Sequence, residues 1–354
     1  MSDYMPVEVM IGILKRLPAK SLVRFRSVCK SCDTLISDPS FISTHLQASL
    51  SNNTPFLLFL CVKNGKTRVN FLLWNPSIEK YISLPKFRIS EAAVFLNVGF
   101  GFDSRTNDYK LLILGGVDEG NSWIQPYLFS LKENCWKRVR AVQPNYAFRR
   151  QRSLPFVNGA VHWLGNRKRN GGGYSHEILG FDMSVEEFFE INLPENLTDL
   201  CHADLTIMKY GESSIAVSTY QAYAELHDLW VMKEYGLVES WTKVLTLHRV
   251  VLNTDFPRVM GFRKNGQVLL QEHNLKIASL DLNSQQMGAS LHLNCQEIEL
   301  PGLIFWTDLF SVDNYVESLV LIDKAVHIRS ASDVNHPIYL SDSDESNGGE
   351  SGVA

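Results

Sequence analysis

The sequence has no long hydrophobic segment, few cysteines and no strong charge of one sign. Its longest uninterrupted apolar run is Phe56–Val62, whereas a helix that spans a bilayer needs roughly 18 apolar residues. The six cysteines are scattered over 354 residues, too sparsely for a secreted disulfide scaffold. The net charge of −4 favours neither nucleic acid nor a membrane surface as a partner. The opening MSDYMPVEVM lacks a secretory signal pattern, so we expect a cytoplasmic or nuclear protein, or one in both compartments.

The sequence also lacks the motifs that would predict catalysis. H-E-x-x-H, G-x-x-x-x-G-K-[ST] and G-x-S-x-G are all absent, so no zinc-protease helix, phosphate loop or nucleophile elbow is predicted. Gly99-Phe-Gly101 is only a G-x-G, which a strand entering a turn explains. Asp103, Asp108 and Asp182 lie in or near turns, where Asp side chains cap the backbone. We therefore expect no catalytic residue, no metal site and no cofactor.

Residues 1–50 have a helical pattern that the rest of the chain lacks. Val7, Met10, Ile11 and Leu14 follow the i, i+3, i+4, i+7 spacing of an amphipathic helix. Pro18 predicts the end of that segment, and apolar residues recur at helical spacing as far as residue 46. So small a helical segment buries little surface alone. We therefore expect this segment to gain stability by binding a partner.

The stretch MPVEVMIGILKRLPAKSLVRFRSVCKSCDTLISDPSFISTHL resembles the F-box in its plant form, over about 40 residues. That resemblance implies a three-helix module that binds a Skp-type adaptor and, through it, a cullin–RING ubiquitin ligase. The family register implies a set of adaptor-binding residues: Met5, Pro6, Leu14, Leu17, Pro18, Leu22, Val28 and Lys30. The chain departs from the family where Met5 replaces Leu and Cys32 replaces Trp.

Two further features of this segment allow a functional and a structural interpretation. Cys29 and Cys32 have the C-x-x-C spacing of a redox or zinc site, but no second pair and no C-x-x-H accompanies them. We expect packed or surface cysteines without such a role. Phe25 and Ile36 are expected to pack the helical core.

After residue 50 the chain alternates short β-type runs with turn signals, typical of an all-β sandwich, barrel or propeller. One unit recurs, in which an apolar strand and a polar turn precede a strand centred on an aromatic residue. Those aromatics are Tyr81, Trp136, Phe188 and Trp241, spaced by 55, 52 and 53 residues, and Met287 occupies the place in a weaker fifth copy. A period of about 50 residues with β content predicts kelch-like propeller blades.

The motifs WNPSIEKYISLP, GFGFDSRTNDYKLL, FVNGAVHWLG and ILGFDMSVEEFFEINLP resemble the F-box-associated domain of plant F-box proteins. We expect an all-α F-box at 1–50 and an all-β, kelch-like β-propeller of five or six blades at 51–324, in which an incomplete first blade is an alternative to a complete one. A strand at Val316–Ile322 is expected to close the ring by pairing with Phe56–Val62. Residues 325–354 form a tail that should be disordered from about 341.

The resemblance implies a non-catalytic substrate receptor of an SCF-type (Skp–cullin–F-box) ubiquitin ligase, which recruits an unidentified target protein. A binding module or decoy receptor without ligase function is an alternative, because Cys32 replaces the usual Trp. A propeller enzyme is disfavoured, since no catalytic constellation accompanies the strands. Substrate-binding residues are not identified. Arg149, Arg150 and Arg152 are weak candidates for gripping an acidic segment, although a solvated loop explains them better.

Overall fold

We describe the protein from a computed structural model. The structure describes residues 6–50, 58–64, 68–75, 77–78, 80–88, 95–116, 123–140, 146–148, 154–169, 174–200, 203–221, 226–248, 258–263, 265–271, 277–282 and 318–321. Two compact units are present. The described residues of the first are 6–50, 58, 74–75, 77–78, 80–82 and 318–321, and the second holds most of the strands.

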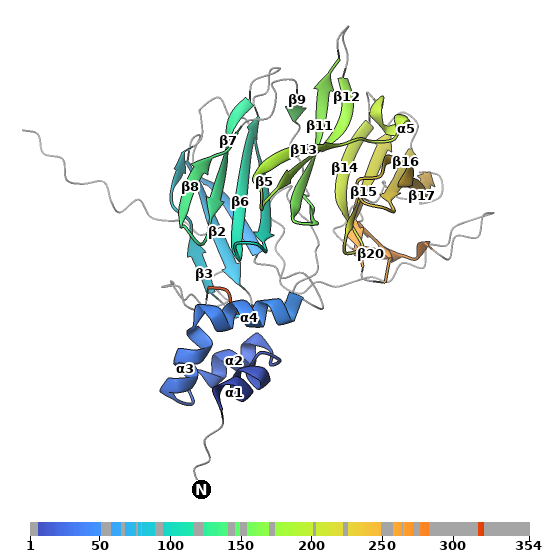
Figure 1. Ribbon diagram of the computed structural model, residues 1–354. Coiled ribbons are helices and arrows are strands. Elements are labelled where there is room, and N and C mark those ends of the chain that lie inside the picture. Colours follow the sequence, from blue (N-terminus) through green and yellow to red (C-terminus); the bar gives the residue numbers. More distant parts are fainter. Residues whose placement is uncertain are drawn as a thin grey trace, which may run out of the picture. The chain divides into compact units, whose positions relative to one another are not determined.

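The helical part of the first unit has four helices, where the resemblance implies three (Figure 1): α1 Val7–Leu14, α2 Ala19–Phe25, α3 Lys30–Ser37 and α4 Pro39–Leu50. Pro6 and Pro18 occupy the N-cap positions of α1 and α2. Asp38 accepts hydrogen bonds from the backbone N–H groups of Ser40 and Phe41, which caps the start of α4. The breaks between α1 and α2 and between α3 and α4 thus fall where Pro18 and Asp38-Pro39 predict them.

The core of the helical unit draws on residues far away in the sequence. Leu319 is fully buried and packs against the helices together with Ile78, from the turn after β2 (Arg68–Asn75). The side-chain amide of Asn75 donates hydrogen bonds to the backbone carbonyls of Ser318 (2.9 Å) and Val320 (2.8 Å). The helical members of this buried cluster are Leu14, Ala19, Leu22, Ile36, Phe41 and Ile42.

The β-strands form five antiparallel sheets in the described residues (Figure 1). The first sheet contains β1 Leu58–Asn64, β2, β3 Lys80–Ser83 and β4 Phe87–Arg88. The second contains β5 Phe95–Asp103, β6 Asp108–Gly116, β7 Trp123–Ser130 and β8 Cys135–Arg138. The third contains β9 Tyr146–Phe148, β10 Phe156–Val157, β11 Ala160–Lys168, β12 Tyr174–Asp182 and β13 Glu187–Ile191.

The short helix α5 Glu195–Thr198 leads to the fourth sheet, which contains β14 Ala203–Tyr210, β15 Ser214–Gln221, β16 Leu226–Met232 and β17 Trp241–His248. A 3₁₀ turn, η1 Val238–Ser240, precedes β17. The described part of the fifth sheet contains β18 Arg258–Phe262, β19 Val268–Gln271 and β20 Ile277–Leu280. Along the main path of each sheet, strands consecutive in sequence are neighbours, which is the arrangement of propeller blades; β4 pairs instead with β2, and β9 with β11.

Neighbouring sheets share hydrophobic cores. Trp163 and Phe181 of the third sheet pack with Leu112 and Leu128 of the second. Ile178 of the third sheet belongs to a cluster that continues into the fourth, and Met208 of the fourth belongs to one that continues into the fifth. Because every blade buries its faces only against its neighbours, the sheets stabilise one another in sequence order.

The expected repeat of aromatic residues is confirmed where the structure describes it. Tyr81, Trp136, Phe188 and Trp241 lie on β3, β8, β13 and β17, while Met287 lies outside the described residues. The indole N–H groups of two of them make equivalent contacts. Trp136 donates to the carbonyl of Pro85 (3.0 Å), and Trp241 donates to the carbonyl of Asn192 (3.3 Å). Each acceptor follows the corresponding strand of the preceding sheet, so the sequence repeat is a repeat of inter-blade contacts.

The expected closing strand is wrong for the residues that can be checked. Ser318 and Leu319 have no regular structure, and Val320 and Leu321 form a turn. These residues bury Leu319 in the helical unit instead, because Asn75 binds their carbonyl groups. Val316, Glu317 and Ile322, the rest of that segment, lie outside the described residues, as does the whole 325–354 tail.

Candidate functional site

The described adaptor-binding candidates divide into exposed and buried side chains. Pro6, Pro18 and Lys30 are exposed, Leu17 is half-buried, and Val28 has 68% of its surface exposed. Met5 lies outside the described residues.

Leu14 and Leu22 require a correction. They are 7% and 0% exposed and pack the helical core, so their side chains are not part of the available surface. The amphipathic stripe that contains Leu14 faces the unit's own core, which the family register does not reveal.

The structure adds exposed apolar residues that the sequence interpretation missed. Val9 and Ile13 are about half exposed on α1, and their i, i+4 spacing places them on one helix face. Phe25, expected in the core, is 41% exposed at the end of α2, whereas Ile36 is buried as expected. The available signal was that Val9 and Ile13 are apolar but lie outside the stripe of α1. With Pro6, Pro18, Val28 and Lys30, these three residues define the candidate adaptor surface.

The segment between α2 and α3 presents Val28 on a locally ordered backbone. The N–H of Val28 donates to the carbonyl of Phe25 (3.1 Å). The guanidinium of Arg26 donates to the carboxylate of Asp33 in the first turn of α3 (2.6 Å). Val28 is therefore held outward between a helix end and a helix start, with positive charge from Lys30 nearby in sequence. An exposed valine fixed in this way is suited to burial in a partner.

Cys29 and Cys32 lie together at the start of α3. The Sγ of Cys29 accepts a hydrogen bond from the backbone N–H of Cys32 (3.3 Å), and the two sulfurs are 3.1 Å apart. Contact with the Cys32 thiol and N–H lowers the pKa of Cys29 below its ordinary value. The hydrogen bond with Cys29 raises the pKa of Cys32 above its ordinary value, and burial raises it further. The first thiol is therefore the more readily ionised of the two.

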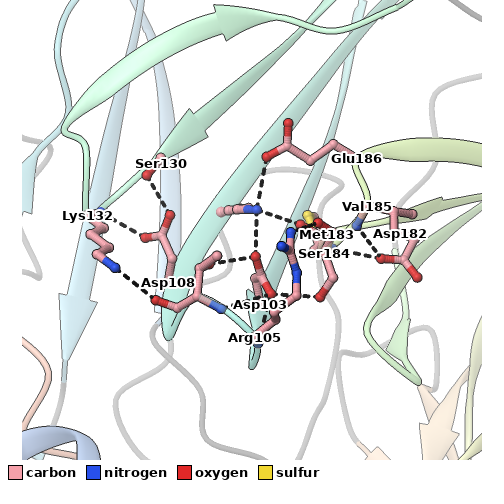
Figure 2. A network of polar contacts seen from close by, with 12 residues as sticks. Asp103, Arg105, Asp108, Ser130, Lys132, Asp182, Met183, Ser184, Val185 and Glu186 are labelled. Atoms are coloured by element: carbon pink, nitrogen blue, oxygen red, sulfur yellow. Dashed lines mark hydrogen bonds and ion pairs between the residues drawn. The ribbon is translucent and has the colours of Figure 1, made fainter.

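Asp103 and Asp182 cap their own turns as expected, whereas Asp108 accepts the N–H of Lys132 in the β7–β8 turn (2.8 Å). Asp103 also belongs to a buried charged cluster (Figure 2). The carboxylate of Asp103 accepts hydrogen bonds from the Nζ of Lys110 (2.8 Å) and from the hydroxyl of Ser184 (2.7 Å). Lys110 Nζ also donates to Glu186 (3.0 Å) and to the carbonyl of Met183 (2.6 Å). Because Asp103 and Lys110 flank the β5–β6 turn and the others lie in the β12–β13 turn, the cluster joins two sheets.

The charge pairing outweighs burial in this cluster. Burial alone would raise the pKa of Asp103, but hydrogen bonds from Lys110, Thr106 and Ser184 hold it well below its usual range. Burial would likewise lower the pKa of Lys110, but its carboxylate partners raise it. Asp103, Lys110 and Glu186 are thus all ionised at neutral pH, which is typical of a structural cluster rather than of an acid–base pair.

Glycines at the same inter-sheet boundary make room for side chains. A Cβ built on Gly99 would lie 2.7 Å from Val161 and 2.8 Å from Trp163, and one on Gly101 would lie 2.5 Å from Phe156. Both glycines lie within β5. The G-x-G is therefore a packing feature of a strand, as the sequence indicated.

Two histidines are buried in the propeller. His227 Nε2 contacts the hydroxyl of Ser218, but its Nδ1 has no hydrogen-bond partner in the described atoms, so no carboxylate orients the ring. His162 Nε2 contacts the hydroxyl of Tyr235 (2.6 Å). Burial lowers the pKa of each histidine to about 4, which keeps both neutral at pH 7.

The arginine candidates for substrate binding cannot be located in the part of the chain that the structure describes. Arg149, Arg150 and Arg152 lie outside it. Within it, no three His, Cys, Asp or Glu side chains gather to bind a metal. No described helix is long and apolar enough to cross a membrane.

Comparison with known families identifies both parts of the chain. Residues 3–44 match the F-box domain, and residues 45–322 match the F-box associated beta propeller domain. The chain belongs to the family of F-box proteins with an associated β-propeller. F-box proteins of this kind are generally substrate-recognition subunits of SCF ligases.

The relatives are consistent with this assignment. F-box protein CPR1 of Arabidopsis thaliana is 28% identical over 82% of this chain and 85% of its own length. An F-box/kelch-repeat protein of Arabidopsis thaliana is 26% identical over 75% of this chain and 85% of its own length.

Proposed function

We propose that this protein is the substrate receptor of an SCF-type ubiquitin ligase, in which the F-box binds a Skp-type adaptor and the propeller captures a target protein. The exposed apolar side chains of Val28, Phe25, Val9 and Ile13 carry the proposal, because all four lie within the residues that match the F-box. Exposed apolar groups gathered on one small unit are typical of a binding surface.

Ubiquitin transfer in this proposal is supplied by the partners. The receptor holds the target beside a ubiquitin-charged enzyme, which raises the effective concentration of the reacting groups without a nucleophile of its own. Residues 1–50 act as the adaptor-binding domain and 51–324 as the substrate-binding domain, in the cytoplasm, the nucleus or both. The cullin–RING ligase is reached through the adaptor.

The test is co-purification of the full-length protein with a recombinant Skp-type adaptor. Val28→Asp should weaken binding at least tenfold, about 1.4 kcal/mol, because the interface would bury a carboxylate without a partner. Val185→Asp is the matched control. Val185 is 64% exposed in the β12–β13 turn, similar to the 68% of Val28. The Val185→Asp variant should therefore leave adaptor binding unchanged.

Two outcomes oppose the proposal. Equal adaptor binding by wild type and Val28→Asp would remove Val28 from the interface. A wild-type protein that fails to bind the adaptor while its propeller melts cooperatively would favour the decoy-receptor hypothesis. That hypothesis rests on the replacement of the usual Trp by Cys32.

A further inference from the structure

The two thiols at the start of α3 are arranged for chemistry that the F-box assignment does not explain. Cys29 is exposed and Cys32 is partly exposed. Their sulfurs are 3.1 Å apart, and Cys29 also accepts the N–H of Cys32. The eight-residue helix α3 begins directly after Cys29, so the positive end of its dipole lies at this sulfur. Thiol proximity and stabilisation of a thiolate therefore occur at one accessible place.

Two simpler roles account for this arrangement less well. Capping alone would be served better by Ser, Thr, Asp or Asn, which are the preferred N-cap residues. A zinc site needs four ligands, and no group of three candidate ligands occurs within the described ranges. The pairing of one exposed thiol with a second thiol three residues later is left unexplained by both.

We propose that Cys29 and Cys32 form a reversible dithiol–disulfide couple whose oxidant is a small-molecule disulfide such as glutathione disulfide. Cys29 is the attacking thiol, since it is the more exposed of the two and lies at the N-cap of α3. Cys32 is the resolving thiol. The proposal does not depend on adaptor binding.

The exchange balances in two steps. The Cys29 thiol loses its proton to solvent, and the thiolate attacks one sulfur of glutathione disulfide, so that a mixed disulfide forms and the first glutathione leaves as a thiolate. The Cys32 thiolate then attacks the Cys29 sulfur, which forms the Cys29–Cys32 bond and releases the second glutathione. The protein loses two electrons and two protons, and one glutathione disulfide becomes two glutathione thiols. Excess reduced glutathione reverses both steps.

The first measurement compares alkylation of the full-length reduced protein at pH 7. Cys135 is the internal control, because it is also an exposed free cysteine, on β8, where its Sγ contacts the carboxylate of Glu133 (3.7 Å) rather than a second thiol. Iodoacetamide should modify Cys29 at least about tenfold faster than Cys135, since the thiolate is the reactive form. Equal rates at the two cysteines would overturn the assignment of Cys29 as the attacking thiol.

The second measurement locates the bond after equilibration with a series of glutathione redox buffers. Trypsin cleaves after Lys30, and a protease specific for the bond before Asp33 separates Cys32 from Cys61. A Cys29–Cys32 disulfide should then link Ser27–Lys30 to Ser31–Cys32, and dithiothreitol should release the two peptides. If oxidised wild type instead accumulates a glutathione adduct on Cys29, Cys32 does not resolve it and the proposed couple is wrong.

Serine variants separate the two roles. Cys32→Ser should trap a glutathione adduct on Cys29, because the resolving thiol is absent. Cys29→Ser keeps an oxygen acceptor at the N-cap and should leave Cys32 without the intramolecular bond. The opposite pattern, with Cys29→Ser trapping the adduct on Cys32, would contradict the assigned order of attack. Failure of Val28→Asp to affect adaptor binding would leave these results unchanged, so the two proposals fail separately.

Discussion

Lys110→Met should destabilise the propeller strongly, because it removes the cation from a buried charged cluster. Lys110 is 4% exposed, and its Nζ lies 2.8 Å from Asp103 and 3.0 Å from Glu186. Methionine keeps a similar unbranched chain, so the change removes the charge while conserving much of the packing. Asp103, which is fully buried, would be left without its cation.

The magnitude follows from the burial of that carboxylate. Removal of one partner from a buried ion pair typically costs about 3–5 kcal/mol. For a unit of this size, one kcal/mol lowers the melting temperature by roughly 2–4 °C, so the melting temperature should fall by roughly 10 °C. Lys137→Met is the control. Lys137 also contacts Glu186 (2.7 Å), but its side chain is 39% exposed, so its removal should cost under about 1 kcal/mol.

The pH dependence tests the cause. In the wild type the pKa of Asp103 lies below its unfolded value, so its contribution to stability is present above about pH 4 and is lost as the pH falls through the folded pKa. Without Lys110, burial should raise that pKa, and protonation would then relieve the penalty. The difference in melting temperature between Lys110→Met and wild type should therefore shrink from pH 7 to pH 4.

The assay is thermal unfolding followed by circular dichroism over that pH range. A Lys110→Met protein that melts within about 2 °C of wild type at pH 7, or one that loses no more than Lys137→Met, would refute the reasoning. A difference that stays constant with pH would show that the loss comes from packing rather than from the unpaired carboxylate.

Three other perturbations have definite expected results. Gly180→Ala should lower the free energy of unfolding by about 1–3 kcal/mol, since its Cβ would lie 2.2 Å from the Phe189 ring. Gly12→Ala, at a helix position with open space around it, should be neutral or stabilising, and thermal melting compares the two variants. Asn75→Asp removes the buried amide donor to the Ser318 carbonyl and should cost about 1–3 kcal/mol of unfolding free energy, measured by urea titration against wild type. The pKa of His162 is lowered to about 4. The free energy of unfolding should therefore fall by about 2 kcal/mol between pH 7 and pH 5, because the unfolded state binds the proton. A His162→Gln protein whose stability, measured by urea titration, falls equally steeply would contradict this.

Much of the propeller could be predicted from the sequence because its signals are local and repeated. The outer-strand aromatics recur at a regular spacing, and Trp136 and Trp241 make equivalent contacts to the preceding sheet. Asp103 and Asp182 cap their turns as their positions indicated. Turn chemistry depends on neighbouring residues, and the repeat of about 50 residues is a pattern along the chain, so a single sequence contains both signals.

The inter-sheet contacts could not be predicted in the same way. Lys110 and Glu186 lie in different sheets, and nothing in either local pattern indicates that Lys110 is buried. The exposed residues of the helical unit could not be predicted for a related reason. An apolar stripe shows which residues one face contains, but it does not tell whether a core or a partner covers that face. Leu14 and Leu22 therefore proved to be core residues, and Phe25 proved to be exposed.

Leu319 shows how far the F-box of this protein extends beyond its sequence motif. Its side chain is fully buried among residues of α1, α2, α3 and α4, so replacing it with alanine should cost about 2–5 kcal/mol. The backbone around it is held by Asn75, at the end of β2. An isolated 1–50 fragment would lack both the buried side chain and its support, so its core would be exposed where Leu319 packs. If Val28 and Phe25 bind the adaptor as proposed, their placement depends on a segment near the other end of the chain, so the adaptor-binding test uses the full-length protein.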